Sequence, residues 1–243
     1  MIKHTSLILA ALITLCLATA SAQNEKKWTE WSKKDAQKIL DSSPWGQTQT
    51  ESDTSQMFYS PTQDPQRMGR TSNDGSRLAQ GATNQTVNLT YHIRMFSARP
   101  IRQALARLLE LQNNPPDDVK AKLANFAEVK SEDSIIVTVF SESNDQRAGN
   151  IAMQAFNSAI TATLKNGTYL ERSDGKRLFL QEYVPPGKDG FGARFIFLRN
   201  PDGQPFIDAN SGDIHFVAQL SGVPKVDRRF KVADMKYRGE LEY

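Results

Sequence analysis

The residues with the clearest capacity for chemistry are an aspartate and a histidine near the end of the chain. Asp213 and His215 flank Ile214 in a strand-like segment, so the alternation of a strand puts both side chains on one face. A carboxylate beside an imidazole can orient it as a general base, with Ser211 or Ser221 as the nucleophile. Residues two apart on a strand stand side by side rather than head-on, so a solvent-facing histidine is the favoured interpretation. A hydrolase using His215 and Asp213 remains the alternative hypothesis.

The loop just before that strand has the composition of a weak metal site. Asp208, Asn210 and Asp213 offer oxygen atoms at intervals, as calcium loops do. The calcium-loop order puts glycine after the third ligand, whereas Gly212 precedes Asp213, and no glutamate lies at the right distance downstream, so a simple hairpin loop is the favoured interpretation. The chain also lacks a paired-cysteine or His-x-x-x-His zinc motif, a glycine-rich phosphate loop and a G-x-S-x-G elbow. The prediction is no catalytic, metal or cofactor site.

The charge balance argues against nucleic-acid binding. Thirty basic and twenty-seven acidic residues leave a net charge of +3, and the charges are interspersed. A nucleic-acid-binding protein needs a dense basic face with interleaved aromatic residues, and no such pattern is present. The prediction is therefore no nucleic-acid partner.

The first twenty-two residues have the pattern of a signal peptide. A basic start at Lys3 precedes an apolar run over 7–18, and Ala20-Ser21-Ala22 forms a cleavage site. The run is short for a bilayer, and no second run of spanning length follows, so no membrane span is predicted. The single cysteine, Cys16, lies within this segment, so the mature chain is expected to be free of disulfides. A thiol-free exported protein of this size points to a bacterial periplasmic or secreted location after cleavage near Ala22.

Residues 23–46 are predicted to form a tryptophan-rich helical arm. All three tryptophans of the chain, Trp28, Trp31 and Trp45, lie in it. Ser32 and Asp35 have the spacing of a capping box, and Pro44 ends a helix of about three turns. So short a helix is marginal alone, and its apolar side must pack on something. Packing on its own domain is favoured over packing on another protein.

Residues 47–84 are predicted to be a polar flexible linker, and residues 85–243 a globular α+β domain. The linker is rich in Ser, Thr, Gln, Asp, Asn and Gly. The domain opens with an alternating strand over 86–96, which places His92 on the face opposite the apolar residues. Helices are expected near 97–111, 117–126 and 145–164. Strands are expected at 134–140, 168–172, 177–184, 193–199, 204–207, 213–220, 225–231 and 235–243. The fold class is thus α+β, an antiparallel sheet covered on one face by about three helices.

Short motifs at both ends of the mature chain indicate a relationship to other proteins. The arm holds Trp31-Ser-Lys-Lys-Asp35 and Ser43-Pro44-Trp45, and the tail holds Arg229-Phe-Lys-Val232 and Gly239-Glu-Leu-Glu-Tyr243. In these motifs the chain resembles a group of uncharacterised secreted bacterial proteins with an N-terminal Trp-Ser-Lys-x-Asp…Ser-Pro-Trp arm. The resemblance implies kinship and carries no known activity, so no site residue is transferred.

The leading hypothesis from sequence is an exported, non-enzymatic binding or interaction module of the bacterial envelope. Its predicted partner is another envelope protein, contacted through Trp28, Trp31 and Trp45, because tryptophan is over-represented among binding hot spots. The alternatives are a secreted hydrolase using His215 and Asp213, and a carrier of a small molecule or lipid that encloses an apolar cavity.

Overall fold

The computed structural model describes residues 26–53 and 86–243. The predicted signal peptide, its cleavage site near Ala22 and residues 54–84 of the predicted linker lie outside the described residues. Within the described ranges, no helix has the length and apolarity needed to cross a membrane.

Most of the α-helices precede β4, and most of the strands follow α7. The helical segments are η1 (Trp28–Glu30), α2 (Lys33–Asp41), α4 (Arg99–Asn113), α5 (Asp117–Glu128), α6 (Gln146–Ser158), α7 (Thr161–Leu164), η4 (Pro201–Gly203) and η5 (Val232–Asp234). The strands are β1 (Gly46–Asp53), β2 (Val87–Met95), β3 (Ser134–Ser143), β4 (Thr168–Arg172), β5 (Arg177–Phe179), β6 (Glu182–Val184), β7 (Ala193–Leu198), β8 (Asp213–Ala218), β9 (Val226–Lys231), β10 (Lys236–Tyr237) and β11 (Glu240–Leu241).

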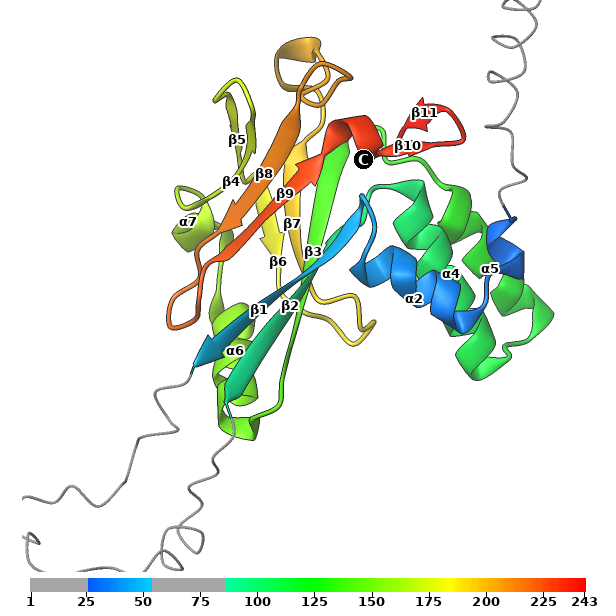
Figure 1. The fold of residues 1–243 in the computed structure, drawn as a ribbon, viewed down its shortest axis with the longest axis horizontal. Coiled ribbons are helices and arrows are strands. Elements are labelled where there is room, and N and C mark those ends of the chain that lie inside the picture. Colours follow the sequence, from blue (N-terminus) through cyan, green and yellow to red (C-terminus); the bar gives the residue numbers. More distant parts are fainter. Residues whose placement is uncertain (1–25, 54–85) are drawn as a thin grey trace, which may run out of the picture.

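The strands build two antiparallel sheets, which confirms the predicted α+β class. One sheet has the order β1-β2-β3-β7-β6 and the other β5-β4-β8-β9, with β10 and β11 forming a separate ribbon (Figure 1). The sequence predicts one strand over 177–184, but the chain there leaves one sheet and enters the other. The amide of Leu180 still donates to Thr168 O at 3.1 Å, and that of Gln181 donates to Ile196 O at 2.9 Å. This crossing joins the two sheets along one edge.

Side chains rather than a backbone ladder join the sheets along the other edge, between β1 and β9. The carboxamide of Gln49 donates to Lys225 O at 2.7 Å and accepts from the amide of Asp227 at 2.8 Å. Two further contacts continue the seam: Gln47 Nε2 donates to Arg229 O at 2.8 Å, and Arg228 Nε donates to Thr48 O at 3.0 Å. Gln49 is 3% exposed, and its amide takes the place that a peptide group would hold in a direct strand pairing.

The strand β1 corrects the predicted linker boundary. Residues 47–53 were expected in a polar linker, yet they pair with β2 over the full register from Gly46↔Arg94 to Asp53↔Val87. Their polarity fits an edge strand whose outward side chains face solvent or bridge to β9. Gly46 is required where the chain turns into β1, because a Cβ there would collide with the carbonyl oxygen of Leu40.

Sequence signals predict the start of α2 correctly, whereas the predicted cap of α4 and the predicted length of the helix over 145–164 are wrong. Ser32 and Asp35 form the predicted capping box, with Asp35 N donating to Ser32 Oγ at 3.1 Å. Ser97 does not cap α4 as its position suggested, because Ala98 is the N-cap and Ser97 Oγ accepts from the amide of Ile136 on β3. The long helix expected over 145–164 breaks after Ser158, leaving α6 and the single turn α7.

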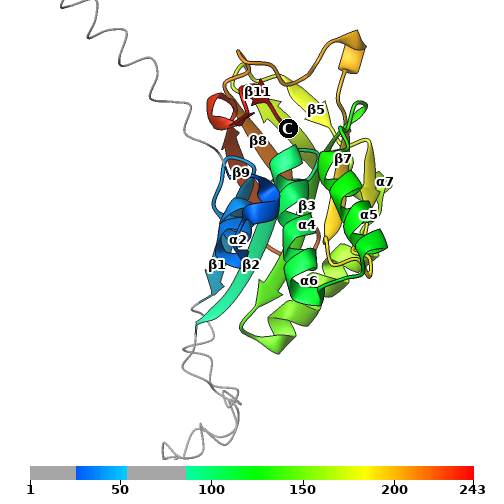
Figure 2. The same ribbon diagram turned by 90° about the vertical axis from the view of Figure 1, so that its right-hand side faces the viewer.

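The buried residues of the helices and of both sheets form one continuous hydrophobic core. Helix α4 lies between α2 and α5 in a layer beside the five-stranded sheet (Figure 2). Between the sheets, Phe195 packs against Tyr183 and Phe216 with ring centroids 5.1 and 5.4 Å apart. At the α6 end, Tyr91 packs edge-on against Phe156. The space that an apolar carrier would leave open for its ligand is thus occupied here by large aromatic side chains.

Candidate functional site

The three tryptophans of the arm are buried against the chain's own domain. Trp28, Trp31 and Trp45 are 9%, 8% and 6% exposed. Each indole N–H donates a hydrogen bond: Trp28 Nε1 to Glu128 Oε1 at 3.0 Å, Trp31 Nε1 to Lys26 O at 3.2 Å, and Trp45 Nε1 to Glu242 O at 2.7 Å.

These contacts reach across the whole described chain. Glu128 ends α5, and Glu242 follows β11, so the arm binds elements that are far away in sequence. The guanidinium of Arg107 on α4 adds a hydrogen bond from Nε to Trp31 O at 2.8 Å. With their rings and N–H groups engaged within the chain, the tryptophans stabilise this fold. Binding of a partner through them remains a prediction, and it requires the arm to leave this position.

The structure does not pair His215 with Asp213. His215 Nε2 instead contacts Asp227 Oδ1 on the neighbouring strand β9, and Lys225 Nζ lies 2.6 Å from Asp227 Oδ2. Burial by itself raises the pKa of the Asp227 carboxyl, but hydrogen bonds from Lys225 and His215 outweigh it and bring the pKa below its ordinary value. His215 thus belongs to an ion cluster on the surface of β8 and β9.

The serines proposed as nucleophiles lie away from this cluster. Ser211 is 2% exposed, and its hydroxyl interacts with Asp208 at the start of its own loop. Ser221 lies in the turn after β8. Among the residues that the structure describes, no serine or threonine hydroxyl forms a hydrogen bond with His215. The Ser–His–Asp arrangement that a hydrolase would need is therefore not assembled at this place.

A second histidine cluster, which the sequence analysis did not identify, joins the arm to the sheet. His92 Nδ1 lies 2.9 Å from Asp41 Oδ1 at the end of α2, and His92 Nε2 lies 3.1 Å from Glu142 Oε1 on β3. Arg94 Nη2 contacts the same Asp41 oxygen at 3.1 Å, and Arg94 Nε donates to Leu40 O. One carboxylate of the arm is thus shared by two cationic groups of β2.

Electrostatics reinforce this cluster. Burial alone raises the pKa of Asp41, but hydrogen bonds from His92, Gln37 and Arg94 outweigh it and hold the pKa of this carboxyl far below its usual range. For His92, the hydrogen bond to Asp41 raises the pKa of the imidazole above its ordinary value against the opposing effect of burial. Glu142 raises it further. Both ring nitrogens face carboxylates, so the arrangement favours a protonated, positively charged histidine that binds two anions.

The loop weighed as a metal site is closed by its own hydrogen bonds. Asp208 Oδ1 accepts from the amide of Asn210 at 2.7 Å, and Asp208 Oδ2 lies 3.7 Å from Arg172. In the described ranges, no group of three or more His, Cys, Asp or Glu residues has the arrangement of a metal site. The geometry is that of a turn in which an aspartate binds the following backbone.

A pocket of about 280 Å³ lies where the β3 side of the sheet meets the C-terminal ribbon. Lys130, Glu132, Arg199 and Glu240 contribute charges of both signs to its walls. Arg199 is already engaged, because its guanidinium lies 3.9 Å from the ring centroid of Tyr243 and donates to Tyr243 O. Such a polar, charged pocket does not suit a lipid.

The outer side of the β5-β4-β8-β9 sheet is a surface of a different kind, here named the open face. In the described residues, the main contacts of α-helices with strands are on β1, β2, β3 and β6, and no α-helix lies over β8 and β9 (Figure 1). Strand alternation and register place ten side chains on the open face: Tyr169, Glu171, Arg177, Phe179, Asp213, His215, Val217, Asp227, Arg229 and Lys231.

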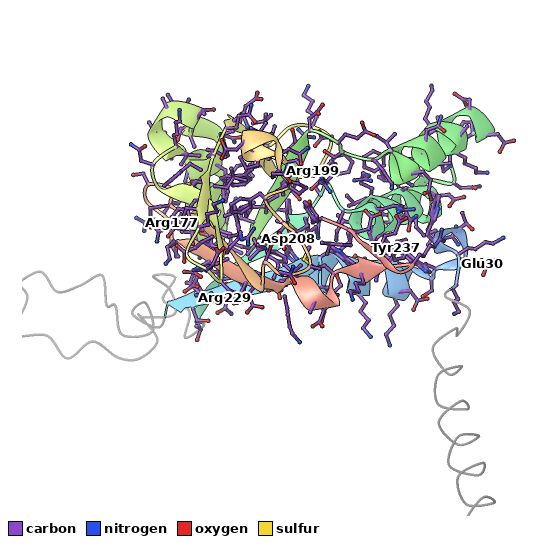
Figure 3. All side chains as sticks on the ribbon, turned by 90° about the horizontal axis from the view of Figure 1, so that it is seen from above. Glu30, Arg177, Arg199, Asp208, Arg229 and Tyr237 are labelled. Atoms are coloured by element: carbon purple, nitrogen blue, oxygen red, sulfur yellow. The ribbon has the colours of Figure 1, made fainter. Side chains whose placement is uncertain are left out.

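The open face combines exposed aromatic surface with charge. Phe179 is 47% exposed and packs edge-on against Tyr169, over which the Arg177 guanidinium lies at 4.4 Å. Arg177 also pairs with Glu171. Arg229 is exposed and forms no ion pair within the described residues. Arg177 and Arg229 lie at the opposite end of the molecule from Glu30 of the arm (Figure 3).

Comparison with known proteins adds no family to this description. No protein-family model, curated protein or solved structure matches the chain.

Proposed function

We propose that this protein is an exported, non-enzymatic binding protein of the bacterial envelope whose contact surface is the open face. The observation that carries the proposal is the exposure of Phe179 beside the unpaired Arg229 on a sheet face without helical cover. The sequence motivates export through the signal-peptide pattern of residues 1–22. The arm is a structural element in this account, since the rings of Trp28, Trp31 and Trp45 are buried within the chain.

The composition of the open face suits a protein partner. Aromatic residues and arginine are enriched at protein interfaces, and a few such residues supply most of the binding energy. Phe179 and Tyr169 provide apolar area, while Arg177 and Arg229 provide planar cationic groups. The stacked position of Arg177 over Tyr169 fixes both side chains before binding, which lowers the entropy cost of association.

The two histidine clusters weigh against the alternative of a hydrolase. His92 contacts a carboxylate at each ring nitrogen, and His215 is paired with Asp227 rather than Asp213. A general base needs a nucleophile or a water within reach of a free ring nitrogen. Of the two histidines, His215 lies on the open face, where it is a polar group beside Asp227.

A site-specific photocrosslinking experiment tests the proposal. A photoreactive residue is placed at Phe179 in one full-length variant and at Met153 in a matched control, in the cells that produce the protein. Met153 is 59% exposed on α6 and lies outside the open face. The proposal predicts a discrete protein adduct from position 179 and none from position 153. Equal labelling at both positions, or no adduct at 179, contradicts it.

A further inference from the structure

The cluster around His92 contains a group whose charge can change with pH, which a purely structural contact would not require. Its centre is a titratable imidazole between two carboxylates that come from different elements, Asp41 from α2 and Glu142 from β3. The His92 side chain is only 13% exposed, whereas that of Glu142 is 60% exposed. One side of the bridge is thus anchored in the protein, and the other is free to swing into solvent.

The charges facing His92 are few, and their sum depends on its proton. Helix α2 contributes Asp41, β3 contributes Glu142, and β2 contributes Arg94, while the residue across from His92 on β1 is the neutral Thr48. With His92 protonated, two cations balance two anions. With His92 neutral, the cluster carries one excess negative charge.

The hydrogen-bonding chemistry changes with the same proton. Neutral His92 can keep a proton on Nδ1 and donate it to Asp41, but Nε2 then presents a lone pair to the Glu142 carboxylate. Two acceptors facing each other repel, so the Glu142 side of the bridge opens. Arg94 continues to hold Asp41 and Leu40 O, so α2 stays attached, but its hydrogen bond from His92 is weaker because the imidazole no longer carries a positive charge.

We propose that His92 is a proton-operated latch: the protonated imidazole ties Asp41 of the arm to Glu142 of β3, and loss of the proton breaks this tie and loosens α2. The folded structure raises the pKa of His92 above its ordinary value near 6.5. The stabilisation is therefore fully present below the pKa of the unfolded chain and is lost as the pH rises through the higher folded-state pKa. The latch is closed in acid and loosened in alkali.

Two measurements on the full-length protein test the latch. NMR follows the titration of the His92 ring, and hydrogen exchange gives protection factors for α2 amides, corrected for the intrinsic pH dependence of exchange. We expect His92 to titrate above the ordinary histidine value. We also expect α2 protection to fall across that titration, while protection in α6, which lies away from the arm, serves as the internal reference.

Three variants sharpen the result. E142Q should move the His92 titration to lower pH and reduce the loss of α2 protection, because an amide can donate to the neutral Nε2. H92Q should remove the pH-dependent step, and H215Q, the matched histidine control, should leave it unchanged. If H92Q does not fold, E142Q still tests the proposal, because the Glu142 side chain is exposed and its substitution should leave the fold intact. A His92 titration at the ordinary value in both wild type and E142Q overturns the proposal, as does α2 protection that stays constant through the titration.

Discussion

The outer sides of the two sheets each carry a histidine paired with carboxylates, and they differ in what covers them. On the five-stranded sheet, His92 lies beneath the end of α2, and its partner Asp41 is fifty-one residues away in the chain. On the four-stranded sheet, His215 contacts Asp227, twelve residues away across one hairpin, and among the described elements no α-helix lies over β8 and β9 (Figure 1). The side chains are 13% and 14% exposed, so burial alone does not distinguish them.

The difference lies in what each cluster connects. The His92 cluster ties an N-terminal segment to the sheet, so breaking it should cost stability. The His215 cluster joins neighbouring strands that a full backbone ladder already holds together, so its contribution is to the character of the surface. The two histidine clusters therefore differ in whether they also hold a distant segment of the chain or only neighbouring strands.

The largest effect is expected from the arm. Trp45→Ala removes a ring that is 6% exposed and packs edge-on against Tyr237 at 6.3 Å, together with the hydrogen bond to Glu242 O. We expect a loss of about 3–5 kcal/mol in the free energy of unfolding, the usual range for truncating a buried large aromatic residue. Urea denaturation followed by circular dichroism measures this loss. A loss below about 1 kcal/mol would mean that the arm is not part of the core.

Asp41→Asn should have the next largest effect. It removes the charge shared by His92 and Arg94, and a hydrogen bond to a charged group contributes about 1.5–3 kcal/mol. Because the folded state lowers the pKa of Asp41, its contribution is present above the unfolded value near 3.9 and is lost as the pH falls toward the folded value. The variant should therefore show a flatter acid limb of stability against pH. An acid limb identical to that of the wild type would exclude this role.

The polar seam between β1 and β9 gives a third, intermediate expectation. Gln49→Ala leaves the amide of Asp227 and the carbonyl of Lys225 without their partner, at a cost of about 1–3 kcal/mol for buried groups. Gln47→Ala, which removes a single exposed hydrogen bond, is the matched control and should cost less. Thermal denaturation of both variants compares them, and equal losses would mean that Gln49 does not close the seam.

Substitutions on the open face should have the smallest effect on stability. Phe179→Ala and Arg229→Ala alter exposed side chains, so we expect changes within about 0.5 kcal/mol in the free energy of unfolding. The same substitutions should also reduce the yield of partner adduct when the photoreactive residue is placed at a neighbouring position of the open face, such as Tyr169. Retention of full capture by the double variant would show that contact occurs elsewhere.

Local signals in the sequence explain what could be predicted. The capping box of Ser32 and Asp35 and the alternation from Val87 to Met95 depend on neighbours in the chain, and both appear as expected. Strand β1 could not be predicted from the sequence, because Gln47, Gln49 and the surrounding Thr, Ser and Asp residues have the composition of a linker. Only the presence of β2 on one side and β9 on the other makes a strand of them.

The candidate site was less accessible to sequence reasoning. Asp213 and His215 drew attention because they are close in sequence, yet the partner of His215 lies on the next strand at Asp227. Asp41, His92 and Glu142 are spread over a hundred residues and share no motif. The one available signal was the strand alternation that put His92 on the polar face with Arg94, and it did not identify the arm as their partner.

Removal of the arm tests the central contrast most directly. A chain that lacks residues 23–46 is compared with the full-length protein by urea denaturation and by crosslinking from position 179. The account predicts that the shortened chain loses most or all of its cooperative unfolding transition. The deletion removes the three buried tryptophans from the core and Asp41 from the His92 cluster. A shortened chain that unfolds with unchanged stability but no longer yields an adduct would contradict the account, since the arm would then be the contact surface.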